Sequence, residues 1–515
     1  MRRSTILVAG CVLAAVTRPS AQQIDPLKAA ADAIGATSIK RLHVSAIGAI
    51  YSVGQSPAPA EPWPRVAIRS YDAVINYESA SMRVDMVRTQ GPVPPRGGGA
   101  PFTGEQRQIQ LVSGNDAWNV AAPPATGPGG AAAPAAAGDP QPQPASAIER
   151  RQQIYLTPHG FLRAALANQA TVKTVPAGTE VSFTISGLST FTGIINSKNQ
   201  VEHVQTLIDN PVLGDMLFEA SFSDYETAGA LSFPFHTLQK QGGHPSLELF
   251  VSNVESNVPV DITVPAAVRS APLPPPRVES QKLAEGVHYM TGGSHHSVAI
   301  DMGDHIVVVE APLDEARSLA LIAKVKETIP GKPIRVVVNT HHHFDHAGGL
   351  RTFVDEGATI VTHQINQAYY VKAWAAPRTL RPDRLARSGK PAAFQTFTDK
   401  EVLTGVNRTV EVHWIANSRH DDGFAMIYLP AEKILIEADA YTPAAAAPAT
   451  PVPPATAGNA AAQPQPPPPV VSPTAVNLYE NIQRLKLDVE RIAALHGPRL
   501  ATIGDLKTAV GRGSE

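Results

Sequence analysis

Residues 341–349 read HHHFDHAGG, and a strongly apolar run leads directly into them. Side chains alternate along extended backbone, so His341 and His343 project to the same side. Asp345 and His346 follow where the chain turns into a helix, and they can face a second, adjacent ion. Neutral imidazoles and carboxylates are the usual ligands of a borderline ion such as zinc, and two glycines allow backbone and metals to approach closely. The stretch therefore predicts a metal site at the end of a buried strand.

Three further candidate ligands each lie at the C-terminal end of a short apolar run: His420, Asp439 and His496. Strand ends along one edge of a sheet are where α/β proteins place their sites. The sequence thus supplies enough imidazoles and carboxylates, in separate segments, for two neighbouring ions.

With these motifs, residues 280–515 resemble the metallo-β-lactamase-fold hydrolase superfamily. The resemblance implies an αββα sandwich, in which two mixed sheets pack face to face with helices outside and the metals at one edge. Helical patterns at 313–327 and 477–489 agree with this architecture. The metal ligands that the resemblance implies are His341, His343 and His420 for the first ion, Asp345, His346 and His496 for the second, and Asp439 as a carboxylate bridging both.

The ligand set implies two divalent metal ions, with zinc favoured and iron or manganese as alternatives. Such a pair can hold a bridging hydroxide at neutral pH and polarise a substrate oxygen. Asp345 would ligate one ion and orient the hydroxide or shuttle its proton. Among neighbouring residues, His342 and His363 are expected to support the site, whereas His295 and His296 either border the pocket or are partly exposed hairpin residues. Tyr441 is either an ordinary loop residue, which is favoured, or a donor to a substrate oxyanion.

These features favour a hydrolase of a small-molecule ester, thioester, lactone or phosphoester. A β-lactamase is the first alternative, but Asp439 counts against it. Cys11 is the only cysteine, and a protein cleaved after Ala21 would lack it, which disfavours the β-lactamases that use a cysteine ligand. A binding protein with a non-catalytic metal domain is the second alternative, which the complete ligand set disfavours. The net charge of −2 without a long basic run does not indicate nucleic acid as a partner. The oligomeric state stays open.

The first 21 residues read as a signal peptide. A basic start at Arg2 and Arg3 precedes an apolar stretch at 6–16, which is too short to span a bilayer, and Ala21 offers a cleavage point. The expected location is therefore the periplasm or the exterior. Lipid attachment at Cys11 is the disfavoured alternative.

Residues 24–265 are expected to form a mainly antiparallel β domain, so the chain as a whole belongs to the α+β class. The domain begins with a helix at 26–34 and contains another at 161–168. Segments with alternating polar and apolar residues predict strands at 42–53, 65–77, 82–89, 108–112, 180–185, 191–195, 216–222 and 247–251. Runs rich in proline, alanine and glycine predict a disordered or extended insertion at 121–145, a linker at 266–279 and a second insertion at 443–473, which is either a lid or, as favoured, a tolerated loop.

Overall fold

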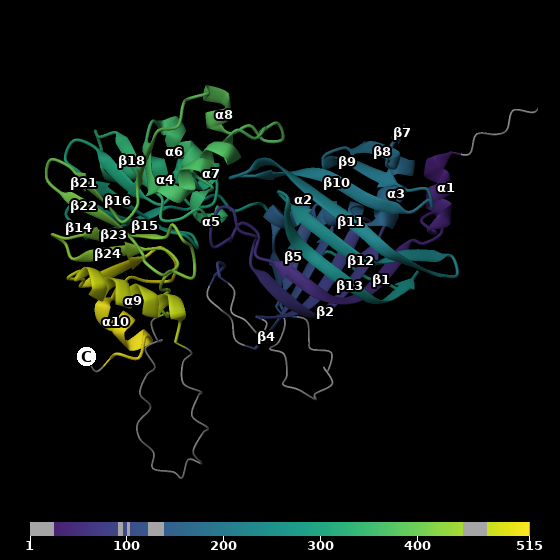
Figure 1. Ribbon diagram of the computed structural model, residues 1–515, viewed down its shortest axis with the longest axis horizontal. Coiled ribbons are helices and arrows are strands. Elements are labelled where there is room, and N and C mark those ends of the chain that lie inside the picture. Colours follow the sequence, from purple (N-terminus) through teal and green to yellow (C-terminus); the bar gives the residue numbers. More distant parts are fainter. Residues whose placement is uncertain (1–24, 91–95, 100–103, 122–137, 446–470, 514–515) are drawn as a thin grey trace, which may run out of the picture.

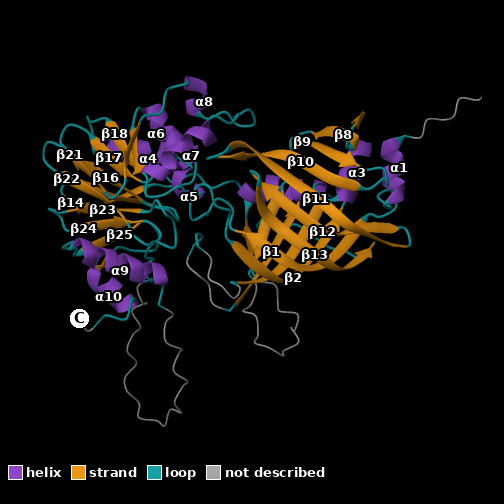
Figure 2. Ribbon diagram, in the orientation of Figure 1, coloured by secondary structure: helices purple, strands orange, loops and turns teal. Residues whose placement is uncertain are grey.

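The computed structural model describes residues 25–90, 96–99, 104–121, 138–445 and 471–513. These residues form three sheets, one in the N-terminal part of the chain and two in the C-terminal part (Figures 1 and 2). The predicted α+β class is confirmed. The predicted signal peptide at 1–21 lies outside the described residues, as do the central parts of both insertions.

The N-terminal sheet has 13 strands in the order β6-β5-β4-β3-β2-β1-β13-β12-β11-β10-β9-β8-β7. Each neighbouring pair is antiparallel, as predicted, and the first long strand, β1, pairs with the last, β13. The strongly curved sheet dominates one half of the molecule in Figure 2. Its strands are β1 (Arg41–Tyr51), β2 (Arg65–Asn76), β3 (Ser81–Thr89), β4 (Glu105–Ser113), β5 (Asp116–Val120), β6 (Pro140–Pro142), β7 (Thr171–Val175), β8 (Gly178–Ile185), β9 (Ser189–Ile195), β10 (Val201–Asn210), β11 (Gly214–Ala228), β12 (Leu231–Gln241) and β13 (His244–Ser256).

Three helices pack against this sheet: α1 (Pro26–Ala33), α2 (Ala147–Tyr155) and α3 (Pro158–Ala167). Apolar residues of α1 and α3 share one core with strand residues such as Phe218. Proline opens both α1 and α3, directly after a capping side chain that accepts a backbone hydrogen bond. Both helices predicted from sequence are therefore confirmed, although α3 begins three residues earlier than predicted.

The C-terminal end of the first insertion differs from the prediction. Residues 122–137 lie outside the described part, but the expected extended coil gives way to strand β6, which pairs with β5, and to a 3-10 helix at Pro144–Ser146. A proline-rich strand is tolerated at the sheet edge because proline there need not donate a ladder hydrogen bond.

His159 of α3 gives the N-terminal domain a predicted acid sensitivity. Its ring is fully buried, lies 5.7 Å from Phe233 between ring centroids, and bonds the Ile34 carbonyl through Nε2 at 2.9 Å. Burial lowers its pKa from 6.5 to about 4. Between these two pH values the unfolded chain binds a proton that the folded chain does not, so stability falls as the pH falls through this window, by about 3 kcal/mol in total.

The measurement is hydrogen exchange of the most protected β11 amides at pH 7 and pH 4.5, in the wild type and in His159→Phe. We expect the acid-induced loss of unfolding free energy to be about 2–3 kcal/mol larger in the wild type. Equal losses in the two proteins would contradict the assignment to His159.

The C-terminal part contains two mixed sheets that enclose one apolar core. The first sheet consists of β14 (Glu279–Ala284), β15 (Val287–Thr291), β16 (Ser297–Asp301), β17 (Ile306–Val309), β18 (Ile334–Val338), β19 (Thr359–His363) and β20 (Phe394–Phe397). The second sheet consists of β21 (Lys400–Thr404), β22 (Thr409–Trp414), β23 (Ala425–Leu429), β24 (Ile434–Glu437), β25 (Arg491–Ala494) and β26 (Ala501–Thr502). Buried residues of both sheets, such as Val309 and Ile427, belong to the same core cluster.

Helices cover the outer faces of these sheets, as predicted. The helices of this region are α4 (Glu315–Thr328), α5 (Phe344–Ala347), α6 (Leu350–Glu356), α7 (Gln364–Trp374), α8 (Arg384–Ser388), α9 (Pro473–Leu485) and α10 (Ile503–Ala509). Helices α4 to α8 pack on the first sheet, whereas α9 and α10 lie beside the second (Figure 1). The helix predicted at 477–489 begins earlier, at Pro473. It also ends earlier, at Leu485, because Lys486 adopts a left-handed conformation at its C-cap.

Among the described residues, Arg96 of the N-terminal part pairs with Asp422 of the C-terminal part at 2.6 Å, and two further regions also connect the parts. In one, the β10–β11 turn meets the segment after α7: Arg378 donates to the Val212 carbonyl at 2.8 Å, and Asp215 accepts from the Thr379 backbone at 2.8 Å. In the other, the loop between β1 and β2 reaches the start of α5 (Figure 1). Among the described residues, there is no helix with the length and hydropathy needed to span a bilayer.

Candidate metal centre

The predicted ligand stretch, residues 341–349, follows the end of β18 in the first C-terminal sheet. Strands β17, β18 and β19 are parallel, so their carboxyl ends meet at this edge. His341 and His343 are fully buried, with ring centroids 4.5 Å apart. Helix α5 starts directly after them and carries Asp345 and His346. The local backbone therefore turns as the sequence predicts.

A first cluster combines two residues of this stretch with two from the second sheet. The ligand atoms of His341, His343, His420 and Asp439 lie within 4.8 Å of one another. The Nε2 atoms of His341 and His420 are 3.1 Å apart, and His420 Nε2 lies 3.1 Å from Asp439 Oδ2. All four residues were predicted as ligands of metals.

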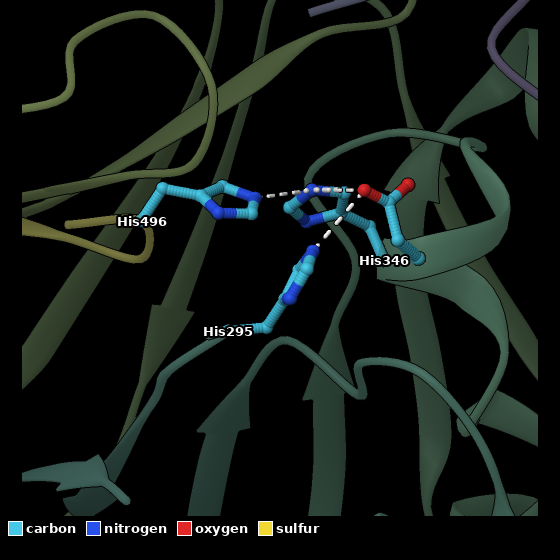
Figure 3. A group of neighbouring side chains, drawn as sticks. His295, His346 and His496 are labelled. Carbon is cyan, nitrogen blue, oxygen red and sulfur yellow. Dashed lines mark hydrogen bonds and ion pairs between the residues drawn. The ribbon is translucent and has the colours of Figure 1, made fainter. Parts of the chain in front are cut away.

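A second cluster lies beside the first. It consists of Asp345, His346, His496 and one further residue, His295, again with ligand atoms within 4.8 Å of one another. The Nε2 atoms of His346 and His496 are 3.0 Å apart, and His295 Nε2 lies 3.1 Å from Asp345 Oδ2. Figure 3 shows the rings of His295, His346 and His496 pointing toward one another from three separate segments.

Asp439 joins the two clusters. Its Oδ2 faces His420, whereas its Oδ1 lies 3.1 Å from His346 Nε2 and 2.9 Å from His496 Nε2. The residue follows β24, whose end lies at the same edge of the sandwich as the end of β25, the strand that precedes His496. One carboxylate thus offers an oxygen to each cluster.

The donor chemistry of the clusters fits metal ions. Two imidazole nitrogens about 3 Å apart cannot both point lone pairs at each other without a proton or a cation between them. His343 donates through Nε2 to the Ser56 carbonyl at 2.9 Å, and its Nδ1 is buried without a hydrogen-bond partner. That nitrogen is free to bind a cation in the first cluster.

Comparison with known proteins agrees with this geometry. The family model described as the metallo-beta-lactamase superfamily matches residues 290–486. This region belongs to the metallo-beta-lactamase superfamily. The predicted family and sandwich fold are thereby confirmed, and the region is a metal-dependent hydrolase domain. His496 lies C-terminal to the match.

Several solved structures resemble the chain. A metallo-beta-lactamase from Pontibacter korlensis is 16% identical, with a TM-score of 0.31, and the alignment covers 46% of this chain and 100% of that chain. One from Hirschia baltica is 16% identical, with a TM-score of 0.32 and coverage of 46% and 97%. FIM-1 from Pseudomonas aeruginosa, in a mono-zinc form, is 16% identical, with a TM-score of 0.31 and coverage of 46% and 95%. No curated protein sequence matches the chain.

Electrostatics in the metallo-beta-lactamase domain favour cations at the clusters. Burial lowers the pKa of His343 to about 3 and that of His341 well below its usual value, so both rings are neutral, as metal ligands must be. Burial alone would lower the pKa of His346, but Asp439 and Glu310 raise it well above its usual value. Against the effect of burial, His346 and His420 hold the pKa of Asp439 well below its usual range. Asp439 therefore keeps its negative charge.

Glu310 supports the site although the sequence analysis did not single it out. Its carboxylate is fully buried and accepts from Thr340 Oγ1 at 2.5 Å, while His346 Nδ1 lies 3.1 Å away. The residue has a φ of 74°, a left-handed conformation that costs about 1–2 kcal/mol outside glycine. The bond to Nδ1 directs His346 Nε2 toward the second cluster. A glutamate directly after the apolar strand β17 was the only sequence signal for it.

His342 supports the site from the opposite side of the stretch, as predicted. Its Nδ1 forms an ion pair with Asp421, and its Nε2 lies 2.9 Å from Ser56 Oγ. Asp421 is fully buried, and His342 holds its pKa below the usual value although burial opposes this. Asp421 directly follows the predicted ligand His420, but nothing in the sequence marks it as the partner of His342.

The remaining residues considered from sequence have different positions. His295 belongs to the second cluster, whereas His296 bonds the Gly497 carbonyl through Nε2 at 3.0 Å. His363 packs against Trp414, with ring centroids 6.1 Å apart. Tyr441 is buried, and its backbone N–H donates to Glu437 at 3.0 Å.

The two glycines of the stretch make close contacts with protein rather than with the clusters. A Cβ on Gly348 would lie 1.8 Å from the Leu313 carbonyl oxygen, and one on Gly349 would lie 1.9 Å from Ser318 Oγ. Both positions therefore require glycine so that α5 and α6 can pack against α4 and the segment that leads into it. From sequence, these glycines were predicted to let the backbone approach the metals, so this prediction is corrected.

Proposed function

We propose that this chain is an exported binuclear-metal hydrolase that cleaves an ester, thioester, lactone or phosphoester bond of a small molecule. The observation that carries the proposal is the position of Asp439, which offers one oxygen to each of two His/Asp clusters. Bound at these clusters, two divalent cations would activate water at neutral pH and polarise the substrate oxygen. Zinc is the proposed metal, because its usual ligands are the imidazoles and carboxylates present here.

The protein side chains have separate tasks in this proposal. His341, His343 and His420 would hold the first ion, and Asp345, His346 and His496 the second. Asp345 is exposed enough to meet substrate, with 30% of its side chain accessible, and lies 3.1 Å from His295. It would therefore orient the attacking water and accept its proton. His295 fixes one carboxylate oxygen of Asp345 and would assist the transfer of that proton.

Export is proposed from the N-terminal sequence alone: a basic start, a short apolar stretch and a cleavage point after Ala21. β-Lactam hydrolysis is the competing activity. Asp439 argues against it, because the resemblance places a bridging aspartate in thioesterase, lactonase and phosphodiesterase members. A binding role for the N-terminal sheet would leave the metal clusters without catalytic activity.

Asp345→Ala tests the proposal in full-length protein purified without a histidine tag. We expect the wild type to hold about two metal ions and to turn over one of thioester, lactone, ester, phosphodiester and β-lactam substrates. The variant should lose activity by about a thousandfold or more, because it removes a ligand and a proton acceptor together.

The matched control is Asp304→Ala, which removes an aspartate that bonds a neighbouring histidine, His305, at 2.7 Å outside the clusters. It should retain wild-type activity. Turnover of a β-lactam alone would replace the proposed substrate class, and a wild type without metal or without Asp345-dependent turnover would refute the hydrolase.

A further inference from the structure

The loop between β1 and β2, residues 52–64, crosses from the N-terminal domain to the ligand stretch; we call it the crossing loop. It contacts several residues of the ligand stretch. The Gly54 carbonyl accepts from the Phe344 backbone at 3.2 Å, and the Ser56 carbonyl accepts from His343 Nε2 at 2.9 Å. Further along, the Pro57 carbonyl accepts from the Asp422 backbone at 2.8 Å.

Gln55 makes the contact that bears most directly on the clusters. Its side-chain Nε2 donates to Asp345 Oδ1 at 2.7 Å, while His295 holds the other oxygen, Oδ2, at 3.1 Å. The two contacts fix the rotation of the Asp345 carboxylate, so that Oδ2 faces the second cluster. Without Gln55, Oδ1 of this partly exposed carboxylate would lose its side-chain donor, and the rotation of the group would be less restricted.

The crossing loop is itself built for this close approach. Gly54 has a φ of 75°, and a Cβ there would lie 2.3 Å from ring atoms of Phe344. A second segment of the N-terminal domain holds the loop from behind: the Gly98 backbone donates to the Gln55 carbonyl at 2.9 Å, and Arg96 pairs with Asp422 at 2.6 Å. These contacts leave the loop little room to shift without disturbing both domains.

We propose that Gln55 is a positioning residue of the metal centre, so that the N-terminal domain completes the site of the hydrolase domain. The inference rests on the proposed function, because the carboxylate that Gln55 orients is a proposed ligand of the second ion. Hydrogen bonds to ligating side chains fix their orientation, and their loss typically lowers metal affinity or activity about 10–100-fold. The expected defect is therefore specific to the second ion.

The test uses Gln55→Met, which keeps the length of the side chain and removes the donor, in the full-length protein. The metal-free protein is titrated with Co²⁺, and the visible absorption of each bound ion is recorded. We expect the affinity for the second Co²⁺ to fall about 10–100-fold while that for the first is unchanged. Because Asp345 acts in the reaction, kcat should fall more than KM rises.

Two further variants make the result specific. Gln241→Met removes a matched bond in the same domain, from Nε2 to Glu149 at 2.9 Å, and should bind both ions like the wild type. Gln55→Asn keeps the amide but shortens it, and should reproduce the defect of Gln55→Met; it also serves as the test if the methionine variant does not fold.

The outcomes separate this inference from the proposed function. A wild type that binds no Co²⁺, or has no Asp345-dependent activity, would overturn both. A wild type that binds two ions and is active, with Gln55 variants indistinguishable from Gln241→Met, would overturn only the positioning role. Equal weakening of both ions would also overturn it, because it would indicate general disruption of the interface.

Discussion

Asp439→Asn is expected to lower kcat/KM by about a thousandfold and to reduce the metal content from about two ions to about one. The substitution keeps the shape of the side chain but removes the charge that lies between the clusters. An amide has only one oxygen, so it cannot serve His420 on one side and His346 and His496 on the other, as the two carboxylate oxygens do. Loss of about 4 kcal/mol of transition-state stabilisation corresponds to the stated factor.

The measurement is metal analysis by mass spectrometry together with steady-state kinetics on the substrate found in the screen. Asp301→Asn is the control, because Asp301 forms an ion pair with Lys332 at 2.6 Å in the same domain, away from the clusters. A variant at Asp439 that keeps two ions and activity within tenfold of the wild type would exclude a bridging role.

Glu310→Ala is expected to destabilise the metal-free hydrolase domain by about 3–5 kcal/mol, the usual cost of removing one partner of a buried charged pair. The glutamate is fully buried, and its loss removes one partner of the Thr340 hydroxyl and the partner of His346 Nδ1. The variant should also bind metal about 10–100-fold more weakly, because His346 loses the bond that orients its ring.

Urea unfolding of the metal-free protein, followed by a Zn²⁺ titration of the folded variant, measures both effects. Glu310→Gln keeps an acceptor and the volume of the side chain, so it should lose less stability than the alanine variant. As a control, Glu411→Ala breaks partly exposed contacts to His413 and Lys400, each at 2.8 Å, and should cost about 1 kcal/mol or less. Equal losses at the two glutamates would contradict the role of Glu310.

The sequence predicted the ligand clusters because each ligand lies in a segment that follows the end of a strand at the same edge of the sandwich. His341 and His343 are two residues apart on extended backbone, and Asp439 and His496 follow parallel neighbours, so local patterns contain the necessary information. Whether these residues bind metal stays a prediction. The antiparallel strands of the N-terminal domain could also be predicted, because their side chains alternate between buried and partly exposed, as along β1 and β2.

The residues that surround the ligands could not be predicted in the same way. Gln55 and Ser56 come from a loop that contains no recognisable motif, and they reach the site only because two domains pack together. Glu310 follows β17 without belonging to a recognisable motif, and its left-handed backbone conformation is unusual for glutamate. His295 was judged more typical of an exposed hairpin, and its contact with Asp345 depends on how that hairpin meets the loop that carries His496.

The pairing of β1 with β13 imposes an order of assembly on the protein. Leu42 lies opposite Ser256 in that pairing, so strand β1 reaches its native sheet position only after the whole N-terminal domain has been synthesised. Contacts between segments so distant in sequence form slowly, because the intervening chain must first be brought together. The crossing loop leaves from the end of β1 and touches residues that are synthesised later still. The proposed metal centre would therefore be completed late in biogenesis, after His420, Asp439 and His496 have been synthesised and the hydrolase domain has packed against the waiting crossing loop.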